Sequence, residues 1–159
     1  MTTIALAPTT PTFGHLRVPA TAKDDVASAF AYLSQDSVER SLIDRLEHGD
    51  RSYRLVLAND DNDYFDPSDD TIHWDPHSAL RVSGGTQSPA LGLGHEIDHA
   101  VEDPRTEFRL ASSFDRQYDT LEERRVITGS ERHAAQTLGE GIRYDHGGEP
   151  FRVDSPTAH

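Results

Sequence analysis

Residues 88–100 read Ser-Pro-Ala-Leu-Gly-Leu-Gly-His-Glu-Ile-Asp-His-Ala, and this stretch decides how the rest of the chain is interpreted. Ser88 can cap the start of a helix with its hydroxyl, and Pro89 suits the first helical position, where no N–H is needed. The apolar residues that follow indicate a buried helix. Gly92 and Gly94 each cost about 1 kcal/mol inside a helix, which suggests that another backbone approaches the helix closely there.

Two histidines in this stretch have the spacing of metal ligands. His95 and His99 are four residues apart, so both imidazoles leave the same helix face and can bind one ion. Glu96 stands one step round the helix, where it can take a proton from water without binding the metal. This HExxH pattern supplies two zinc ligands and a general base. We expect a helix over residues 89–102, ended by Pro104, that holds Zn²⁺.

A zinc site of this kind needs a third protein ligand. The long metzincin motif would place Gly at position 102 and His at position 105, but the chain has Glu102 and Arg105. A carboxylate from a later helix is the other common solution. The segment at residues 121–127 supplies two candidates, Glu122 and Glu123.

Both glutamates also have a purely structural interpretation. Thr120 and Glu123 have the spacing of a capping box, in which the glutamate only satisfies backbone donors at a helix start. Asp119 and Glu122 have the same spacing and could fill the same role. From the residues alone, the ligand is Glu123, Glu122 or neither.

The composition limits the classes of partner. The chain has 159 residues with 28 acidic and 15 basic side chains, a formal net charge of −13. Such a surface repels nucleic acid and anionic membranes and tolerates basic or neutral polypeptides. We therefore expect a protein substrate, no nucleic acid, no membrane and a monomer. Because the chain has no cysteine, only His, Asp and Glu can hold a metal.

Periodicity and turn residues predict an α+β organisation. Residues 1–22 are rich in threonine and proline and predict an irregular leader, followed by one domain over residues 23–159. Before the motif, the pattern predicts two helices and two strands, at residues 24–33, 37–49, 53–57 and 71–74.

The acidic segment at residues 59–70 is interpreted as the loop of a hairpin between the two predicted strands. A calcium-binding EF-hand loop would need Gly at its sixth position and Glu at its twelfth. Counted from Asp61, these positions hold Asp66 and Ile72. The hairpin loop is therefore strongly favoured over a calcium site of this type.

The motif and its surroundings resemble the NleD-type zinc metallopeptidases, which are bacterial type III secreted effectors and related toxin domains. The resemblance rests on residues 88–100, on the Glu-Glu-x-Arg segment that begins at Glu122 and on residues 72–76, and it spans roughly residues 52–152. The Glu-Glu-x-Arg segment is also similar to that of clostridial neurotoxin light chains, in which the second glutamate is the third zinc ligand. This similarity favours Glu123.

The resemblance implies a single zincin-like domain, in which a small twisted sheet packs on the HExxH helix. It also implies a secreted zinc endopeptidase, delivered into the host cell cytoplasm as a virulence factor. Family members cleave mitogen-activated protein kinases, so a protein kinase is one substrate class to expect, and the leader fits a secretion signal. Two other hypotheses are a peptidase toxin directed at competing bacteria and a non-catalytic, zinc-stabilised interaction protein; an intact Glu96 speaks against the latter.

The chain departs from the family in the group that stabilises the developing oxyanion. Relatives carry an Arg followed a few residues later by a Tyr near the C-terminus, but no Tyr follows Arg152 here. Because a metallopeptidase needs a donor opposite the attacking water, the candidates are Arg143, Tyr144, Arg152 and His146.

Overall fold

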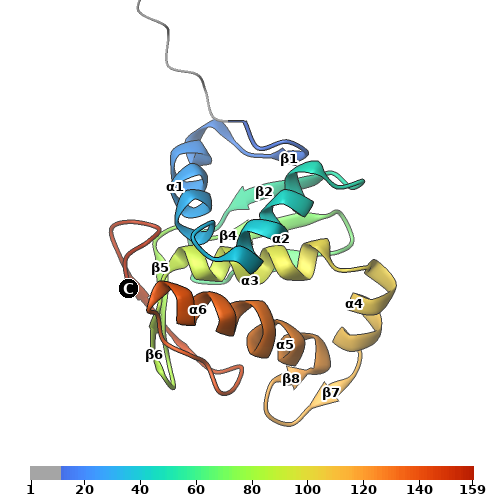
Figure 1. Ribbon diagram of the computed structural model, residues 1–159, viewed down its shortest axis with the longest axis vertical. Coiled ribbons are helices and arrows are strands. Elements are labelled where there is room, and N and C mark those ends of the chain that lie inside the picture. The colour runs from blue at the N-terminus through green and yellow to red at the C-terminus, as the bar shows by residue number, and fades with distance from the viewer. Residues whose placement is uncertain (1–11) are drawn as a thin grey trace, which may run out of the picture.

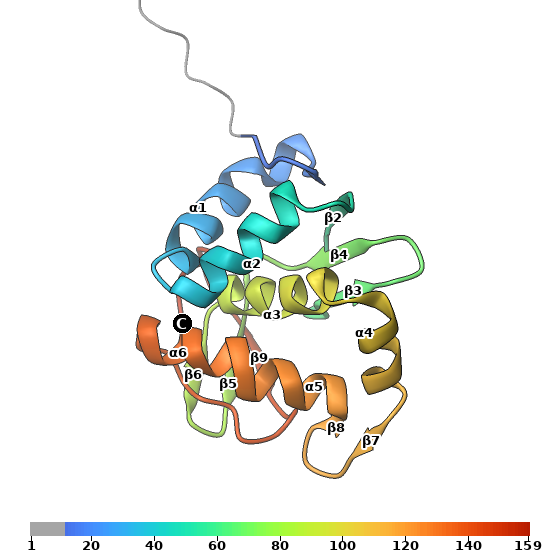
Figure 2. The same cartoon turned by 45° about the vertical axis from the view of Figure 1, so that its right-hand side comes forward.

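The computed structural model describes residues 12–159, which form helices and small sheets around one long buried helix. Helix α3 runs through the middle of the molecule, with α1 and α2 on one side and α5 and α6 on the other (Figure 1). The turned view keeps this order, with α4 at one end of α3 (Figure 2). The helices are α1 (Lys23–Leu33), α2 (Ser37–His48), α3 (Pro89–Val101), α4 (Pro104–Ala111), α5 (Leu121–Val126) and α6 (Arg132–Leu138).

The strands form one mixed sheet and two small antiparallel sheets. The mixed sheet has the order β1-β2-β4-β3 and contains β1 (Leu16–Arg17), β2 (Tyr53–Leu57), β3 (Tyr64–Asp66) and β4 (Thr71–Trp74). Strands β1, β2 and β4 are parallel, and β3 is an antiparallel edge strand. The second sheet has the order β6-β5-β9, with β5 (Ser78–Val82), β6 (Gly85–Gln87) and β9 (Glu149–Arg152); β7 (Phe114–Asp115) pairs with β8 (Asp119–Thr120).

The expected hairpin between β2 and β4 is wrong. The two strands pair in parallel, with Leu55 opposite Ile72. Their connection, residues 58–70, meets the roughly dozen residues that a parallel crossover requires and contains β3, which itself turns back to pair with β4. The acidic segment is therefore the crossover that carries the edge strand, rather than the tip of a hairpin.

Helix α3 begins and ends as its sequence predicts. The Ser88 hydroxyl accepts a hydrogen bond from the N–H of Leu91 at 3.2 Å, and Pro89 follows it as the first helical residue. At the C-terminal end, where backbone carbonyls lack helical partners, two arginines donate to them: Arg45 to Val101 O at 2.7 Å and Arg51 to Ala100 O at 3.0 Å.

The two glycines of α3 make room for carboxylates rather than for another backbone, so that expectation is wrong. A Cβ built at Gly94 would lie 2.6 Å from Glu39 Oε2, and one built at Gly92 would lie 2.9 Å from Asp63 Oδ2. Every other residue of α3 is buried. Acidic side chains from α2 and from the crossover therefore pack directly against α3 at these two glycines.

Part of the predicted irregular leader is ordered. Within residues 12–22, Leu16–Arg17 pairs with β2 and Ala20–Ala22 forms a 3₁₀ turn. Phe13 and Leu16 are buried in the same apolar cluster as α1, α2 and α3. The rest of the predicted leader, residues 1–11, lies outside the described residues.

Candidate metal centre

His95, His99 and Glu123 converge on one point and could bind a metal ion. Their ligand atoms all lie within 4.8 Å of one another. The two Nε2 atoms are 3.0 Å apart, Glu123 Oε2 is 3.1 Å from His95 Nε2, and Glu123 Oε1 is 3.2 Å from His99 Nε2. The histidines come from one face of α3, and Glu123 comes from the first turn of α5.

The hydrogen bonds around the two imidazoles suit a cation at this point. Each Nδ1 faces a carboxylate, Glu131 for His95 at 2.7 Å and Glu122 for His99 at 3.0 Å. Because a carboxylate only accepts hydrogen bonds, each Nδ1 carries the hydrogen, and the Nε2 lone pairs are directed at each other. Glu123 Oε2 is buried and has no hydrogen-bond partner among residues 12–159. A cation would satisfy all three groups.

The carboxylates behind the histidines are themselves held by arginines. Arg143 donates from Nε and Nη2 to the two oxygens of Glu131, at 2.9 and 2.6 Å. Arg125 does the same for Glu122, at 3.0 and 2.6 Å. Charged, two-pronged contacts of this kind fix both position and orientation. The imidazole rings are therefore locked before any metal binds.

Glu123 and Glu122 divide the roles that the sequence left open. The N–H of Glu123 donates to the Thr120 hydroxyl at 3.1 Å, so Thr120 caps α5. The Glu123 side chain does not return to complete a capping box and instead faces the two histidines. Glu122 is buried behind His99. The structure therefore places Glu123 in the ligand group and Glu122 behind it.

The pKa values of Glu123 and His99 are shifted by their neighbours in the ligand group. Burial opposes ionisation of Glu123, but the facing imidazoles of His95 and His99 outweigh it and hold the pKa of that carboxyl far below its usual range. Burial lowers the pKa of His99, and contacts with Glu122 and Glu123 reverse this and raise it to about 9. The site thus strongly favours positive charge between these side chains.

A cleft of about 590 Å³ opens over the ligand group. Glu96 lines it, with one oxygen 3.9 Å from His95 Nε2, and is buried. Asp63, from the crossover, also lines the cleft. Burial together with the nearby Glu96 raises the pKa of Asp63 to about 8, although its hydrogen bond from Asp75 N–H acts the other way. Reactive groups therefore sit at the floor of a cleft that is open to a ligand.

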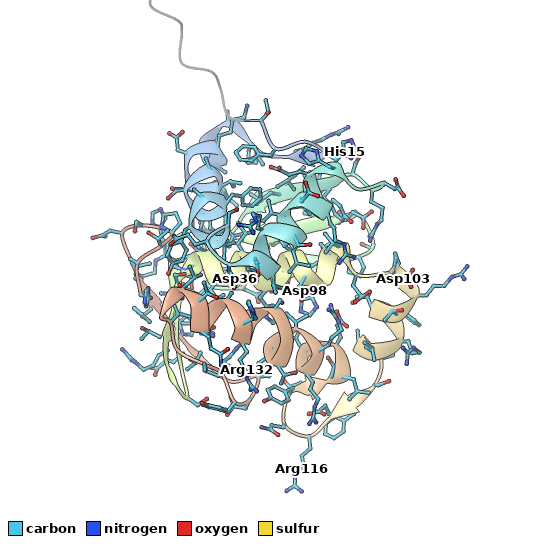
Figure 3. All side chains as sticks on the ribbon, viewed as in Figure 1. His15, Asp36, Asp98, Asp103, Arg116 and Arg132 are labelled. Carbon is cyan, nitrogen blue, oxygen red and sulfur yellow. The ribbon has the colours of Figure 1, made fainter. Side chains whose placement is uncertain are left out.

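The expected oxyanion donors occupy very different positions. Arg143 lines the cleft but is buried and engaged by Glu131, with Nη2 3.3 Å from His95 Nδ1. Tyr144 is 53% exposed, lies outside the cleft lining and places its ring over Arg132. Figure 3 labels Arg132 at the start of α6, and its Nη2 donates to Arg143 O at 3.4 Å.

Arg152 and His146 complete this comparison. Arg152 lies on β9 and pairs with Asp75 at 2.6 Å and Asp61 at 3.1 Å, outside the cleft lining. His146 lines the cleft, with Nδ1 2.6 Å from Asp119 Oδ2 and Nε2 3.4 Å from Glu123 Oε2. Of the four candidates, His146 is the side chain that faces the open space beside the ligand group.

Glu131 was missed by sequence reasoning, as was the supporting role of Glu122. Glu131 ends a π-helical turn, Ile127–Glu131, that links α5 to α6 and is kinked at Gly129, where the backbone is not helical. No local motif marks it, although Glu131 follows Glu123 by about two helical turns, which is a signal that a helical-wheel inspection could have found. Single π turns inside α-helices are often found at functional sites.

Comparisons of the chain with protein-family models, with curated proteins and with solved structures found no match. Among the described residues, no helix has the length and apolar character needed to cross a membrane.

Proposed function

We propose that this chain is a zinc-dependent endopeptidase with a zincin-like arrangement. The observation that carries the proposal is the convergence of His95, His99 and Glu123, with Glu96 beside them, at the floor of an open cleft. Two imidazoles and one carboxylate are a common zinc donor set, and three protein ligands leave a position for water. The carboxylates behind both histidines are typical of such sites.

Each residue has a defined part in peptide hydrolysis. A zinc ion held by the three ligands would supply a Lewis acid that makes a water molecule acidic near neutral pH. Glu96 takes the proton from this water as it attacks the peptide carbonyl, and then delivers the proton to the departing amine. His146 faces the cleft from the other side of Glu123 and is placed to contact the carbonyl oxygen. Arg143 keeps Glu131, and through it His95, in position.

The edge strand β3 offers a way to bind an extended peptide. Tyr64 and Phe65 of β3 line the cleft, and β3 pairs with β4 on one side as the last strand of its sheet. A substrate strand added to this edge would hydrogen-bond along its backbone and pass over Glu96. This arrangement supports hydrolysis within a polypeptide chain.

The biological setting rests on the resemblance to NleD-type peptidases. We propose a secreted bacterial effector that acts in the cytoplasm of a host cell on a host protein, with protein kinases as one candidate class. A peptidase toxin against competing bacteria would use the same chemistry on another target. A non-catalytic zinc-stabilised protein is disfavoured, because a purely structural site has no use for Glu96.

A census of new peptide N-termini in eukaryotic cell lysate tests the proposal. The wild-type protein should create termini that are absent with Glu96→Ala and absent in the presence of a zinc chelator. Glu96→Ala should retain one zinc per chain, measured by atomic emission. No Glu96-dependent cleavage in host or bacterial lysate by the folded, zinc-loaded protein would refute the peptidase.

A further inference from the structure

A second cavity adjoins the metal cleft at the C-terminal end of α3. Its volume is about 340 Å³, and it shares Phe65, His99 and Glu107 with the lining of the metal cleft. The two spaces therefore lie next to each other and share these three side chains as walls. Because His99 belongs to the ligand group, a side chain that enters this side cavity comes from a residue close to the bond being cut.

The walls of the side cavity suit a long aliphatic stem. Phe65 and Pro67 form one wall, from β3 and the turn that follows it, and Pro104 and Phe108 form the other, from α4. Phe108 is 72% exposed, so its ring is available to a ligand. Aromatic rings and prolines of this kind pack on methylene groups and also attract cations.

Carboxylates outnumber cations around the side cavity. Arg125 is a single cation that contacts three carboxylates, those of Asp98, Glu102 and Glu122. Figure 3 marks Asp98 on α3, facing the C-terminal helices. Arg51, the other cation here, is paired with Asp70 at 2.5 Å and donates to a backbone carbonyl of α3.

Glu107 is the acidic group of this cavity that is left without a partner. It lies on α4 and lines both cavities, and within residues 12–159 its side chain makes no hydrogen bond or ion pair. It is half-buried; burial and the nearby Glu122 raise its pKa, and the charges of His99, Arg125 and Arg51 act the other way. A half-buried carboxylate that makes no hydrogen bond or ion pair, beside the metal cleft, favours a cationic ligand group.

We propose that the side cavity binds an arginine or lysine side chain of the substrate, next to the scissile bond, with Glu107 as its counter-charge. This inference rests on the proposed peptidase function and adds a substrate class to it, a polypeptide with a basic residue beside the cleavage site. The methylene stem packs between Phe65 and Phe108, and the cationic end faces Glu107. The net charge of −13 is consistent with a basic partner.

The deciding experiment compares N-acetyl-arginine amide with N-acetyl-citrulline amide, which has nearly the same shape without the charge. Binding to the zinc-loaded full-length protein is followed by NMR, through the ring signals of Phe65 and Phe108. The wild type should bind the arginine compound roughly fivefold more tightly. Glu107→Gln should bind both equally, and the matched control Glu149→Gln, an exposed glutamate outside both cavities, should keep the wild-type difference.

Equal binding of the two compounds to the wild type, or a preference that persists in Glu107→Gln, would overturn the inference. Tighter binding of N-acetyl-norleucine amide than of the arginine compound would also overturn it, because the cavity would then be an apolar pocket. Cleavage of a peptide library measures activity and residue preference separately from the binding of the arginine compound. Arginine binding without Glu96-dependent cleavage would refute the peptidase alone, whereas cleavage without preference for a basic residue would refute the inference alone.

Discussion

Glu131 Oε2 lies 2.7 Å from Nδ1 of His95, although 36 residues separate the two along the chain. Glu131 is almost completely buried and holds two hydrogen bonds from Arg143 and one from Gln87. A charged partner on Nδ1 orients the ring and makes Nε2 a better ligand. The contact joins α3 to the segment after α5, and so to the rest of the ligand group.

We therefore predict that Glu131→Gln lowers zinc affinity by about 10- to 100-fold. The amide keeps the shape but loses the charge that supports His95. Affinity is measured by competition with a fluorescent chelator, and Glu149→Gln serves as the control for an unrelated glutamate. Unchanged affinity would show that Glu131 only supports packing.

Substitutions of Glu123 and Glu96 should change different properties, zinc affinity for Glu123 and turnover for Glu96. Glu123→Gln should lower zinc affinity by at least about 100-fold, because a charged ligand is lost. Glu96→Gln should keep the zinc content and lower turnover by about 10²- to 10⁴-fold, as expected for loss of a general base. Zinc content is measured by atomic emission after dialysis, and turnover on the peptide identified by the terminus census. If Glu122→Gln loses more zinc than Glu123→Gln, the ligand assignment is wrong.

Substitutions of His146 and of Tyr144 test which of the two side chains stabilises the oxyanion. Because His146 lines the cleft and Tyr144 does not, His146→Gln should lower kcat by about 10²- to 10³-fold. Tyr144→Phe should change kcat less than about threefold, and so should Arg152→Gln. All three should retain zinc, which controls for damage to the site. A large effect of Tyr144→Phe with zinc retained would return the role to Tyr144.

Glu39 gives a prediction about pH and stability. Its carboxyl is fully buried below α3, and neither oxygen has a hydrogen-bond partner among the described residues. Burial raises its pKa from 4.5 to about 8, with Asp98 and Asp36 adding to the effect. The folded state therefore binds this proton more tightly than the unfolded state does. Stability from this group is present below pH 4.5, is lost as pH rises toward 8, and changes little above that.

Replacing Glu39 should remove the loss of stability that its ionisation causes as the pH rises. Glu39→Gln should be more stable than the wild type at pH 8, by on the order of 3 kcal/mol, and close to it at pH 5. The free energy of unfolding is measured with urea at both pH values in the presence of a chelator, so that metal binding does not contribute. A difference between variant and wild type that is the same at both pH values would contradict the assignment to ionisation.

The sequence predicted those helices and strands whose ends are determined by residues within the element or next to it. Helices α1, α2 and α3 and strands β2 and β4 begin within about two residues of their expected positions, because caps, prolines and apolar periodicity act over a few residues. His95, Glu96 and His99 could be found for the same reason, since one helix turn brings them together. The Glu122 and Glu123 alternatives needed the structure, because both carboxylates occupy the same turn.

Pairing between distant segments could not be predicted in this way. The parallel pairing of β2 and β4 depends on the path of the crossover between them. No local sequence signal within residues 58–70 specifies this path. Helix α4 and strands β5, β6 and β9 carry weak periodicity and were not expected. The support from Arg143 to Glu131 depends on the packing of the loop that contains Arg143 against the Ile127–Glu131 turn. This is another contact between segments that are separated in the sequence.

The π-helical turn Ile127–Glu131 makes the length of this segment as important as its side chains. In a regular α-helix, the eight residues from Glu123 to Glu131 would leave the two side chains roughly 80° apart around the axis. The chain leaves regular helical geometry at Gly129, with φ −101° and ψ −106°, and beyond this kink the Glu131 side chain faces His95. Loss of one residue here, such as the exposed Thr128, would swing Glu131 out of reach of His95 without altering any side chain of the site. In this stretch, insertions and deletions should be less well tolerated than substitutions.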